Sequence, residues 1–281
     1  MNRKTKNKFF KILCFSASIS SIVVLALLLY NVASVGLPHL SFDFLSSFPS
    51  RFAEQAGIKS ALFGSIWLLI FITIISVPVG VAAAIYLEEY SPKNKWTKFI
   101  EINISNLAGV PSIVYGILGL VIFVRFFHLE RSILAGSFTM SILILPVIII
   151  TAREAIKAVP KNIRLGAYAL GATKWQTIKH HVLPIATPGI MTGVILAISR
   201  AIGETAPLIM MGAFTYVAFV PNSIWDEFTT LPIQIYNWTS RPQAEFHEIA
   251  SAGIIVLLVV LLTMNAAAII IRKRANKKYD W

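Results

Sequence analysis

The feature of this sequence that most constrains its fold is a series of long apolar runs separated by short charged segments. Hydrophobic residues make up 56% of the 281 residues, and charged residues make up only 14%. A soluble domain of this length needs more charge to cover its surface. A helix, by contrast, needs about 20 apolar residues to cross the hydrocarbon core of a bilayer. The distribution therefore predicts a chain that crosses a membrane several times.

Six apolar runs are long enough to span a bilayer, and they occupy residues 9–36, 60–87, 102–124, 132–151, 184–219 and 249–271. In lipid, only helices and closed barrels satisfy all their backbone groups, and these runs lack the alternation of barrel strands. We therefore expect an all-α fold, a polytopic bundle of six transmembrane helices. The first run is longer than the apolar region of a signal peptide, which predicts a retained helix.

Basic residues indicate how the helices are oriented. The formal net charge is +12, and the lysines and arginines gather in the N-terminal arm, in the tail and in the segments after the second and fourth spans. The positive-inside rule therefore predicts an inner-membrane protein with both termini in the cytoplasm. The same rule accounts for the charge without nucleic-acid binding. The single cysteine, Cys14, excludes a disulfide within the chain.

The runs suggest three sections: an N-terminal basic arm, first transmembrane helix and outer loop over 1–58, a core transmembrane domain over 59–272 and a cytoplasmic tail over 273–281. The sequence has no Gly-x-x-x-x-Gly-Lys-Ser/Thr loop for ATP and no nucleophile elbow. Its adjacent His180 and His181 point apart on a helix, so we expect no metal site. We expect no cofactor and no catalysis in this chain. If the chain takes part in a process driven by ATP, a partner protein must hydrolyse the ATP.

The longest cytoplasmic segment, residues 152–183, has the pattern of two short helices joined by a glycine turn. Pro160 interrupts the first part, Gly171 marks the turn, and Thr173 is placed to cap the second helix. The segment could be a plain connecting loop, but it is amphipathic. A short helix that projects from a membrane can dock into a groove of a partner.

This segment resembles the cytoplasmic signature of ABC importer permeases: Glu-Ala-Ala, three residues, Gly, nine residues, Ile, one residue, Leu-Pro. Leu165, Gly166 and His181 depart from the signature, whereas its spacing is kept throughout. The resemblance implies a type I ABC importer permease fold. It also implies a coupling helix that sits in a cleft of an ATPase subunit, with the coupling positions Ala167, Gly171, Ala172, Leu183 and Pro184.

The fifth apolar run contains two charged residues, Arg200 and Glu204, which are four apart and share one helical face. Ionisable residues inside a membrane are costly and usually face a cavity or a partner. One interpretation is structural: the pair pins this helix to its neighbours. The other is that the pair lines a substrate path together with Ser199 and Thr205, since a guanidinium presents a fork of donors to an oxyanion. Gly203 and Pro207 predict a break in the helix at this point.

A phosphate substrate would explain why a carboxylate lies in a path for anions. Near neutral pH phosphate carries a proton that Glu204 could accept in a hydrogen bond, whereas sulfate carries none. The stretch Arg-Ala-Ile-Gly-Glu-Thr-Ala-Pro-Leu at 200–208 is similar to the signature of phosphate-specific (Pst-type) ABC permeases, and it is closer to their A-type subunit. That family has an arginine at the position of Arg153 too, although Arg153 could equally be an interfacial anchor.

The resemblance covers most of residues 60–272. It implies phosphate as the substrate and three kinds of protein partner: a homologous second permease, a cytoplasmic ABC ATPase dimer and an extracytoplasmic phosphate-binding protein. Three alternatives stay open. The chain could be an ABC permease for another oxyanion such as molybdate or sulfate, or for another small solute. It could also be a stand-alone secondary transporter or a membrane-embedded enzyme.

Overall fold

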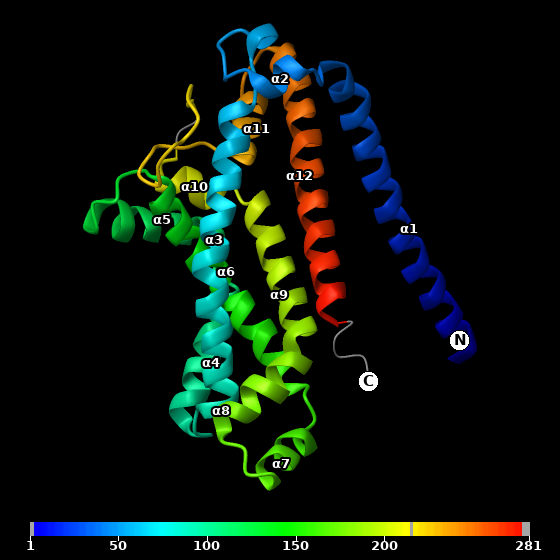
Figure 1. The fold of residues 1–281 in the computed structure, drawn as a ribbon. Helices are drawn as coiled ribbons and strands as arrows, with labels where there is room; N and C mark the ends of the chain where they lie inside the picture. The colour runs from blue at the N-terminus through cyan, green and yellow to red at the C-terminus, as the bar shows by residue number, and fades with distance from the viewer. Residues whose placement is uncertain (1–2, 214–215, 277–281) are drawn as a thin grey trace.

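The structure is a computed structural model that describes residues 3–213 and 216–276 of the chain. Within these residues the fold is built from helices, and the single strand-like pairing is an isolated bridge between Ser132 and Glu227 (Figure 1). The all-α prediction is therefore confirmed. Residues 214–215 of the expected fifth span and residues 277–281 of the expected tail lie outside the described part of the chain.

Five long apolar helices form the bundle, and they agree with the first, second, fourth, fifth and sixth predicted spans. The five helices are α1 (Arg3–Gly36), α3 (Lys59–Ile85), α6 (Ile133–Lys157), α9 (Leu183–Gly203) and α12 (Ala244–Asn276). Helix α6 among them begins at a polar cap, because Ser132 Oγ accepts a hydrogen bond from the backbone N–H of Ala135.

The third predicted span is not one straight helix. It consists of α4 (Lys95–Leu107) and α5 (Ser112–Gly119), which continues through the π-helical turn η4 (Leu120–Phe126), and the two parts meet at 101°. The reason is Pro111, which has no N–H to donate and pushes the preceding residue out of the helical region. Tyr115 Oη holds the bend by donating to the Leu107 carbonyl, 2.8 Å away.

The fifth predicted span, 184–219, is also not one continuous helix, and its membrane-crossing helix is shorter than predicted. Helix α9 ends at Gly203, and a separate short helix, α10 (Ala206–Met211), follows the extended residue Glu204. Gly212 then ends α10 with a φ of 96°, a left-handed conformation that glycine adopts without strain. The predicted break near Gly203 and Pro207 is thus present, but the chain does not continue beyond it as a membrane-crossing helix.

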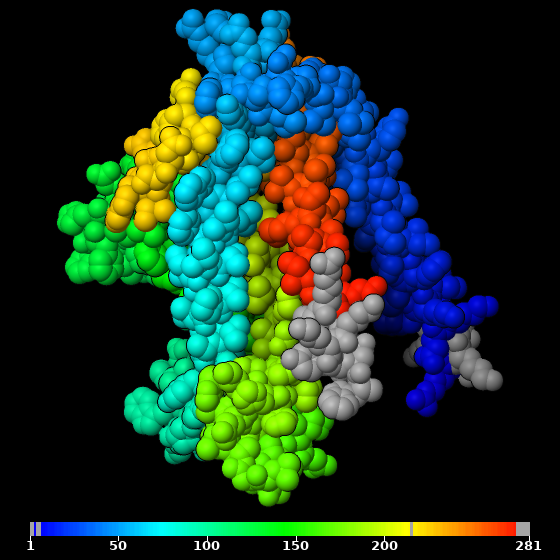
Figure 2. All heavy atoms as spheres, in the orientation of Figure 1, coloured from blue at the N-terminus to red at the C-terminus, as the bar shows by residue number. Residues whose placement is uncertain are grey.

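Helices α3, α6 and α9 form the centre of the bundle, and α10 and α5 pack beside them. Glycines let the helices approach closely: a Cβ on Gly193 of α9 would collide with Thr151 of α6, and one on Gly80 of α3 would lie 2.6 Å from Ile148 of α6. Helix α1 packs on α12 and stands at the edge of the molecule (Figure 2). Its side chains are almost all exposed, as expected for a helix that contacts lipid or another subunit.

The two ends of the bundle differ. One end holds the short elements η1 (Leu37–His39), α2 (Phe42–Ser46), η2 (Ala53–Gln55) and α11 (Leu231–Thr239). The other end, which we call the α7–α8 end, holds the π-helical turn η3 (Tyr86–Tyr90), α7 (Lys161–Ala169), α8 (Lys174–Thr177) and the π-helical turn η5 (Ile178–Val182). Helix α1 begins and α12 ends toward the α7–α8 end (Figure 1).

Candidate functional site

The break between α9 and α10 brings most of the predicted path residues together. Arg200 lies in the last turn of α9, Glu204 is its extended C-cap residue, and Thr205 precedes α10. No side-chain hydrogen bond caps α10 at Thr205, so its hydroxyl is left for another contact. Gly203 is exposed, and a Cβ added there would meet nothing within 4 Å. The break therefore opens onto free space rather than onto another helix of this chain.

Arg200 and Glu204 form an ion pair in which Arg200 Nε lies 3.1 Å from Glu204 Oε1. The side chain of Arg200 is 49% exposed, and that of Glu204 is 19% exposed. The pair uses only the Nε of the guanidinium. Within the described part of the chain its two terminal nitrogens have no hydrogen-bond partner. They can therefore donate to an oxyanion while the pair persists.

Ser199 faces a different neighbour from Arg200. Its Oγ donates to the Ile195 carbonyl at 2.7 Å and lies 2.5 Å from Asn265 Oδ1 on α12. Two helical turns away, Arg272 Nη1 donates to Thr192 Oγ1 at 2.8 Å. These contacts fix the rotation of α9 against α12. Asn265 was not among the predicted site residues, although a lone amide inside an apolar run is a signal for such a contact.

Arg153 lies near the C-terminus of α6, away from the break. Its Nε is 3.0 Å from Glu88 Oε2, and its Nη2 is 2.8 Å from Glu101 Oε1. Because Gly193 of α9 faces Thr151 of α6, Arg153 lies some two and a half helical turns, or roughly 13 Å, from Arg200 along the axis. The structure thus joins Arg153 to α3 and α4 and does not place it beside the other path candidates.

The predicted coupling segment, residues 152–183, contains two short helices, α7 and α8, joined by a glycine turn, as the sequence predicts. Gly171 has a φ of 82°, and the N–H groups of Gly171 and Ala172 donate to the carbonyls of Tyr168 and Ala167. This pair of bonds is the Schellman motif, which requires a left-handed residue at the position of the glycine. Thr173 then caps α8 in a reciprocal capping box with Gln176.

The signature positions of the segment point in different directions. Ala167 is only 6% exposed and packs inward, Ala172 and Pro184 are half-buried, and Leu183 packs on the apolar core between α6 and α9. The outward face instead carries large apolar side chains that were not among the predicted coupling positions: Leu165, Tyr168, Leu170 and Trp175, exposed by 63%, 40%, 91% and 54%. They belong to α7, to α8 and to the turn between these helices, which project at the α7–α8 end of the molecule (Figure 2). An apolar patch outside the membrane-spanning helices marks a protein-binding surface.

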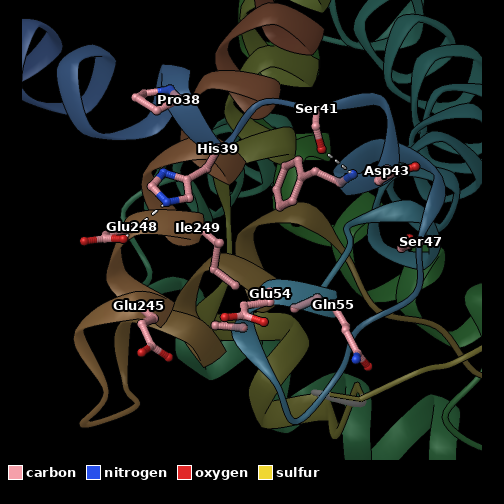
Figure 3. A pocket seen from close by; sticks show the side chains of 13 residues that line it. Pro38, His39, Ser41, Asp43, Ser47, Glu54, Gln55, Glu245, Glu248 and Ile249 are labelled. Atoms are coloured by element: carbon pink, nitrogen blue, oxygen red, sulfur yellow. Dashed lines mark hydrogen bonds and ion pairs between the residues drawn. The ribbon is translucent and has the colours of Figure 1, made fainter.

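A hollow of about 420 Å³ lies at the opposite end of the bundle, among η1, α2, η2 and α12. Four carboxylates line it, from Asp43, Glu54, Glu245 and Glu248, and His39 Nε2 is 3.2 Å from Glu248 Oε2 (Figure 3). None of the predicted path residues line it. Among the described residues there is no cluster of His, Cys, Asp and Glu side chains suited to a metal ion.

The sequence matches the family described as binding-protein-dependent transport system inner membrane component over residues 76–279. It is 33% identical to the probable ABC transporter permease protein YqgI of Bacillus subtilis, over 95% of each chain. It is 32% identical to the phosphate transport system permease protein PstA of Pasteurella multocida, over 98% of this chain and 97% of that protein. For PstA of Yersinia pestis the identity is 33%, over 99% and 92%.

Solved structures share the fold at lower identity. A bacterial alginate ABC transporter superposes with a TM-score of 0.67 at 16% identity, covering 95% of this chain and 96% of that one. The MetNI methionine ABC transporter gives a TM-score of 0.59 at 17% identity, covering 78% and 94%. This likeness supports the type I importer fold and carries no information on the substrate. By sequence and by fold, the chain belongs to the binding-protein-dependent transport system inner membrane components, as a multi-pass ABC transporter permease of the PstA type.

Proposed function

We propose that this chain is one of two paired permease subunits of an ATP-driven importer of inorganic phosphate. Full-length relatives at 32% and 33% identity are named phosphate transport system permease proteins, which supports phosphate as the substrate. The chain itself is not catalytic. ATP hydrolysis belongs to a cytoplasmic ATPase dimer, and an extracytoplasmic binding protein delivers phosphate. Both termini are cytoplasmic, so the α7–α8 end, toward which α1 begins and α12 ends, faces the cytoplasm.

The observation that carries the proposal is the half-exposed Arg200 beside a break in an apolar helix. An arginine that faces lipid near the bilayer centre costs about 2.5–3.5 kcal/mol on insertion scales. The described chain leaves half of this side chain uncovered, so it needs a water-filled path or a neighbouring subunit. A path between this chain and a second permease supplies both.

The chemistry of the pair suits a protonated oxyanion. The free nitrogens of Arg200 donate to phosphate oxygens, and Glu204 accepts the hydrogen of the P–OH group. Sulfate has no such hydrogen, so its oxygens would face the carboxylate without a bond. The same carboxylate occupies one edge of the guanidinium, and this keeps Arg200 from binding the anion too tightly for release. Thr205 adds a hydroxyl beside the pair.

The exposed apolar side chains of Leu165, Tyr168, Leu170 and Trp175, which we call the docking surface, account for how an ATPase supplies energy to this chain. Leu165 and Leu170 on the α7–α8 tip are exposed to an extent that an isolated subunit rarely tolerates outside lipid. A groove on the ATPase would cover them, as grooves cover apolar helix faces in other complexes.

The test is reconstitution of this chain in proteoliposomes with the second permease, the ATPase and the binding protein. We expect uptake of radiolabelled phosphate that requires hydrolysable ATP and is not displaced by excess sulfate. Uptake of molybdate or sulfate in place of phosphate would contradict the substrate assignment. Transport by this chain alone without ATP would contradict the importer assignment.

A further inference from the structure

Arg164, on α7, holds three parts of the chain together at the α7–α8 end. Its Nε and Nη2 donate to Glu89 Oε1 at 3.0 and 2.6 Å. Its Nη1 donates to the Val159 carbonyl at 2.7 Å, and its Nη2 also donates to the Ile156 carbonyl at 2.9 Å. A single side chain thus joins α7 to the end of α3 and to the end of α6.

The local sequence explains why this contact forms. Pro160 stops α6 from continuing, so carbonyls in its last turn lack helical partners, and a cation is favourable at this negative end of the helix dipole. Glu89 lies in the π-helical turn η3 that ends α3. Its side chain is 7% exposed and that of Arg164 is 16% exposed. A buried carboxylate needs such a partner, and removal of either side leaves a charge without compensation.

Arg164 also lies between the docking surface and the bundle. Leu165, the next residue, is 63% exposed on the outward face of α7, whereas Ala167 is 6% exposed on the inward face. Glu88, the neighbour of Glu89, binds Arg153 of α6. Adjacent carboxylates of η3, at the end of α3, therefore hold one arginine of α7 and one arginine of α6.

We propose that the Arg164–Glu89 contact, together with the bonds of Arg164 to the end of α6, transmits displacement of the docking surface to α3 and α6. We call this set of bonds the Arg164 clamp. The inference rests on the proposed function, because it assumes that an ATPase moves α7. Arg164 is a positioning residue in this scheme: it contacts no substrate. The apolar contacts of Ile163 and Ala167 hold α7 against the bundle, but apolar contacts allow one helix to slide over another. The buried ion pair of Arg164 with Glu89 has a single favourable geometry, so movement of α7 must also move η3.

The experiment compares transport with hydrolysis in the complete reconstituted complex. The variants are Arg164→Lys, which keeps the charge and loses the planar fork, and Glu89→Gln, which keeps the shape and loses the charge. Lys98→Ala is the matched control, because Lys98 is an exposed cation at the same end of the bundle. We expect both clamp variants to bind the ATPase and to hydrolyse ATP within about twofold of the unaltered complex. We expect phosphate uptake per ATP to fall about tenfold and to be unchanged in the control.

A second readout does not depend on the substrate. In the unaltered complex, ATP should change the rate of amide hydrogen exchange in two places: in α7 and α8, residues 161–177, and in η3, residues 86–90. In the clamp variants the change should persist in 161–177 and disappear in 86–90. A change that reaches 86–90 in the variants, or an equal fall in uptake and hydrolysis, would overturn the clamp. Absence of ATP-driven phosphate uptake by the unaltered complex would instead contradict the proposed function, and the exchange measurement would still test the clamp.

Discussion

Three arginines of this chain differ in how completely other side chains and carbonyls pair them. Arg153 is held by two carboxylates from two other helices, and Arg164 by a carboxylate and two carbonyls. Arg200 has one carboxylate on its own helix and keeps half of its side chain exposed. In the sequence all three are isolated cations in or beside an apolar or amphipathic stretch. Of the three, only Arg200 leaves both terminal nitrogens without a hydrogen-bond partner among the described residues.

Replacement of Arg200 by lysine tests this difference at the residue scale. Lysine keeps the charge but cannot bind Glu204 and an oxyanion through one planar fork, so ATP-driven phosphate uptake should fall about tenfold or more. Uptake by proteoliposomes is the measurement. Arg125→Lys, at an exposed position at the end of η4, serves as the control and should leave uptake unchanged. Normal uptake by the Arg200→Lys variant would show that the pair is structural.

Glu204→Gln is expected to change selectivity more than stability. Glutamine can still accept a hydrogen bond from Arg200 Nε, so the turn at the end of α9 should keep its shape. It no longer repels an unprotonated oxyanion, and the preference for phosphate over sulfate should fall about fivefold or more. Competition of sulfate against labelled phosphate measures this ratio. An unchanged ratio would remove Glu204 from substrate recognition.

At the scale of the element, turns and close contacts set the geometry of the site. Gly171 and Thr173 end α7 and begin α8 by local hydrogen bonds alone, which is why the sequence predicted this turn correctly. The close approach of α9 to α6 depends instead on Gly193, which lies against Thr151. It holds the helix that carries Arg200 against the central helix α6.

Gly193→Val should therefore destabilise the subunit. The two methyl groups would collide with Thr151 and push α9 away from α6, at a cost of about 1–3 kcal/mol. The thermal unfolding midpoint of the purified protein in detergent is the measurement. Gly166→Ala, on α7, is the control, because a Cβ there meets nothing within 4 Å and should be neutral or slightly stabilising. An unchanged midpoint for Gly193→Val would show that the helices adjust without cost.

In the whole molecule, the candidate functional regions lie at the two ends and in the middle of the bundle. The α7–α8 end presents an apolar surface, the break at Glu204 opens onto free space part-way along the bundle, and the opposite end holds an acidic hollow. Helices α3, α6 and α9 connect these regions as one packed body. Displacement at the tip can therefore reach the break through rigid elements.

The double substitution Leu170→Asp and Trp175→Asp tests the docking surface at this scale. It places charges where an apolar groove is expected to close, so binding of the ATPase should weaken about 30-fold or more. Co-purification of the ATPase with the tagged permease is the measurement. Phe42→Asp introduces a charge at an exposed aromatic residue at the other end, 82% exposed, and should leave ATPase binding intact. Loss of binding in both variants would indicate a folding defect rather than a lost interface.

Elements with a local cause could be predicted from the sequence. The length of the apolar runs predicted five of the six spans correctly. Gly203 and Pro207 predicted the break after α9, and Gly171 with Thr173 predicted the turn between α7 and α8. The reason is that lipid leaves a backbone few alternatives to the helix, and caps act within a few residues.

Which side chains meet depends on tertiary packing. In the folded chain Ala167 faces inward, Ser199 contacts Asn265, and the adjacent acids Glu88 and Glu89 pair with two different arginines. These outcomes depend on the rotation and depth of one helix against another. Side-chain packing sets this rotation and this depth. They cannot be predicted from the spacing of apolar residues, because the helices are apolar on nearly every side.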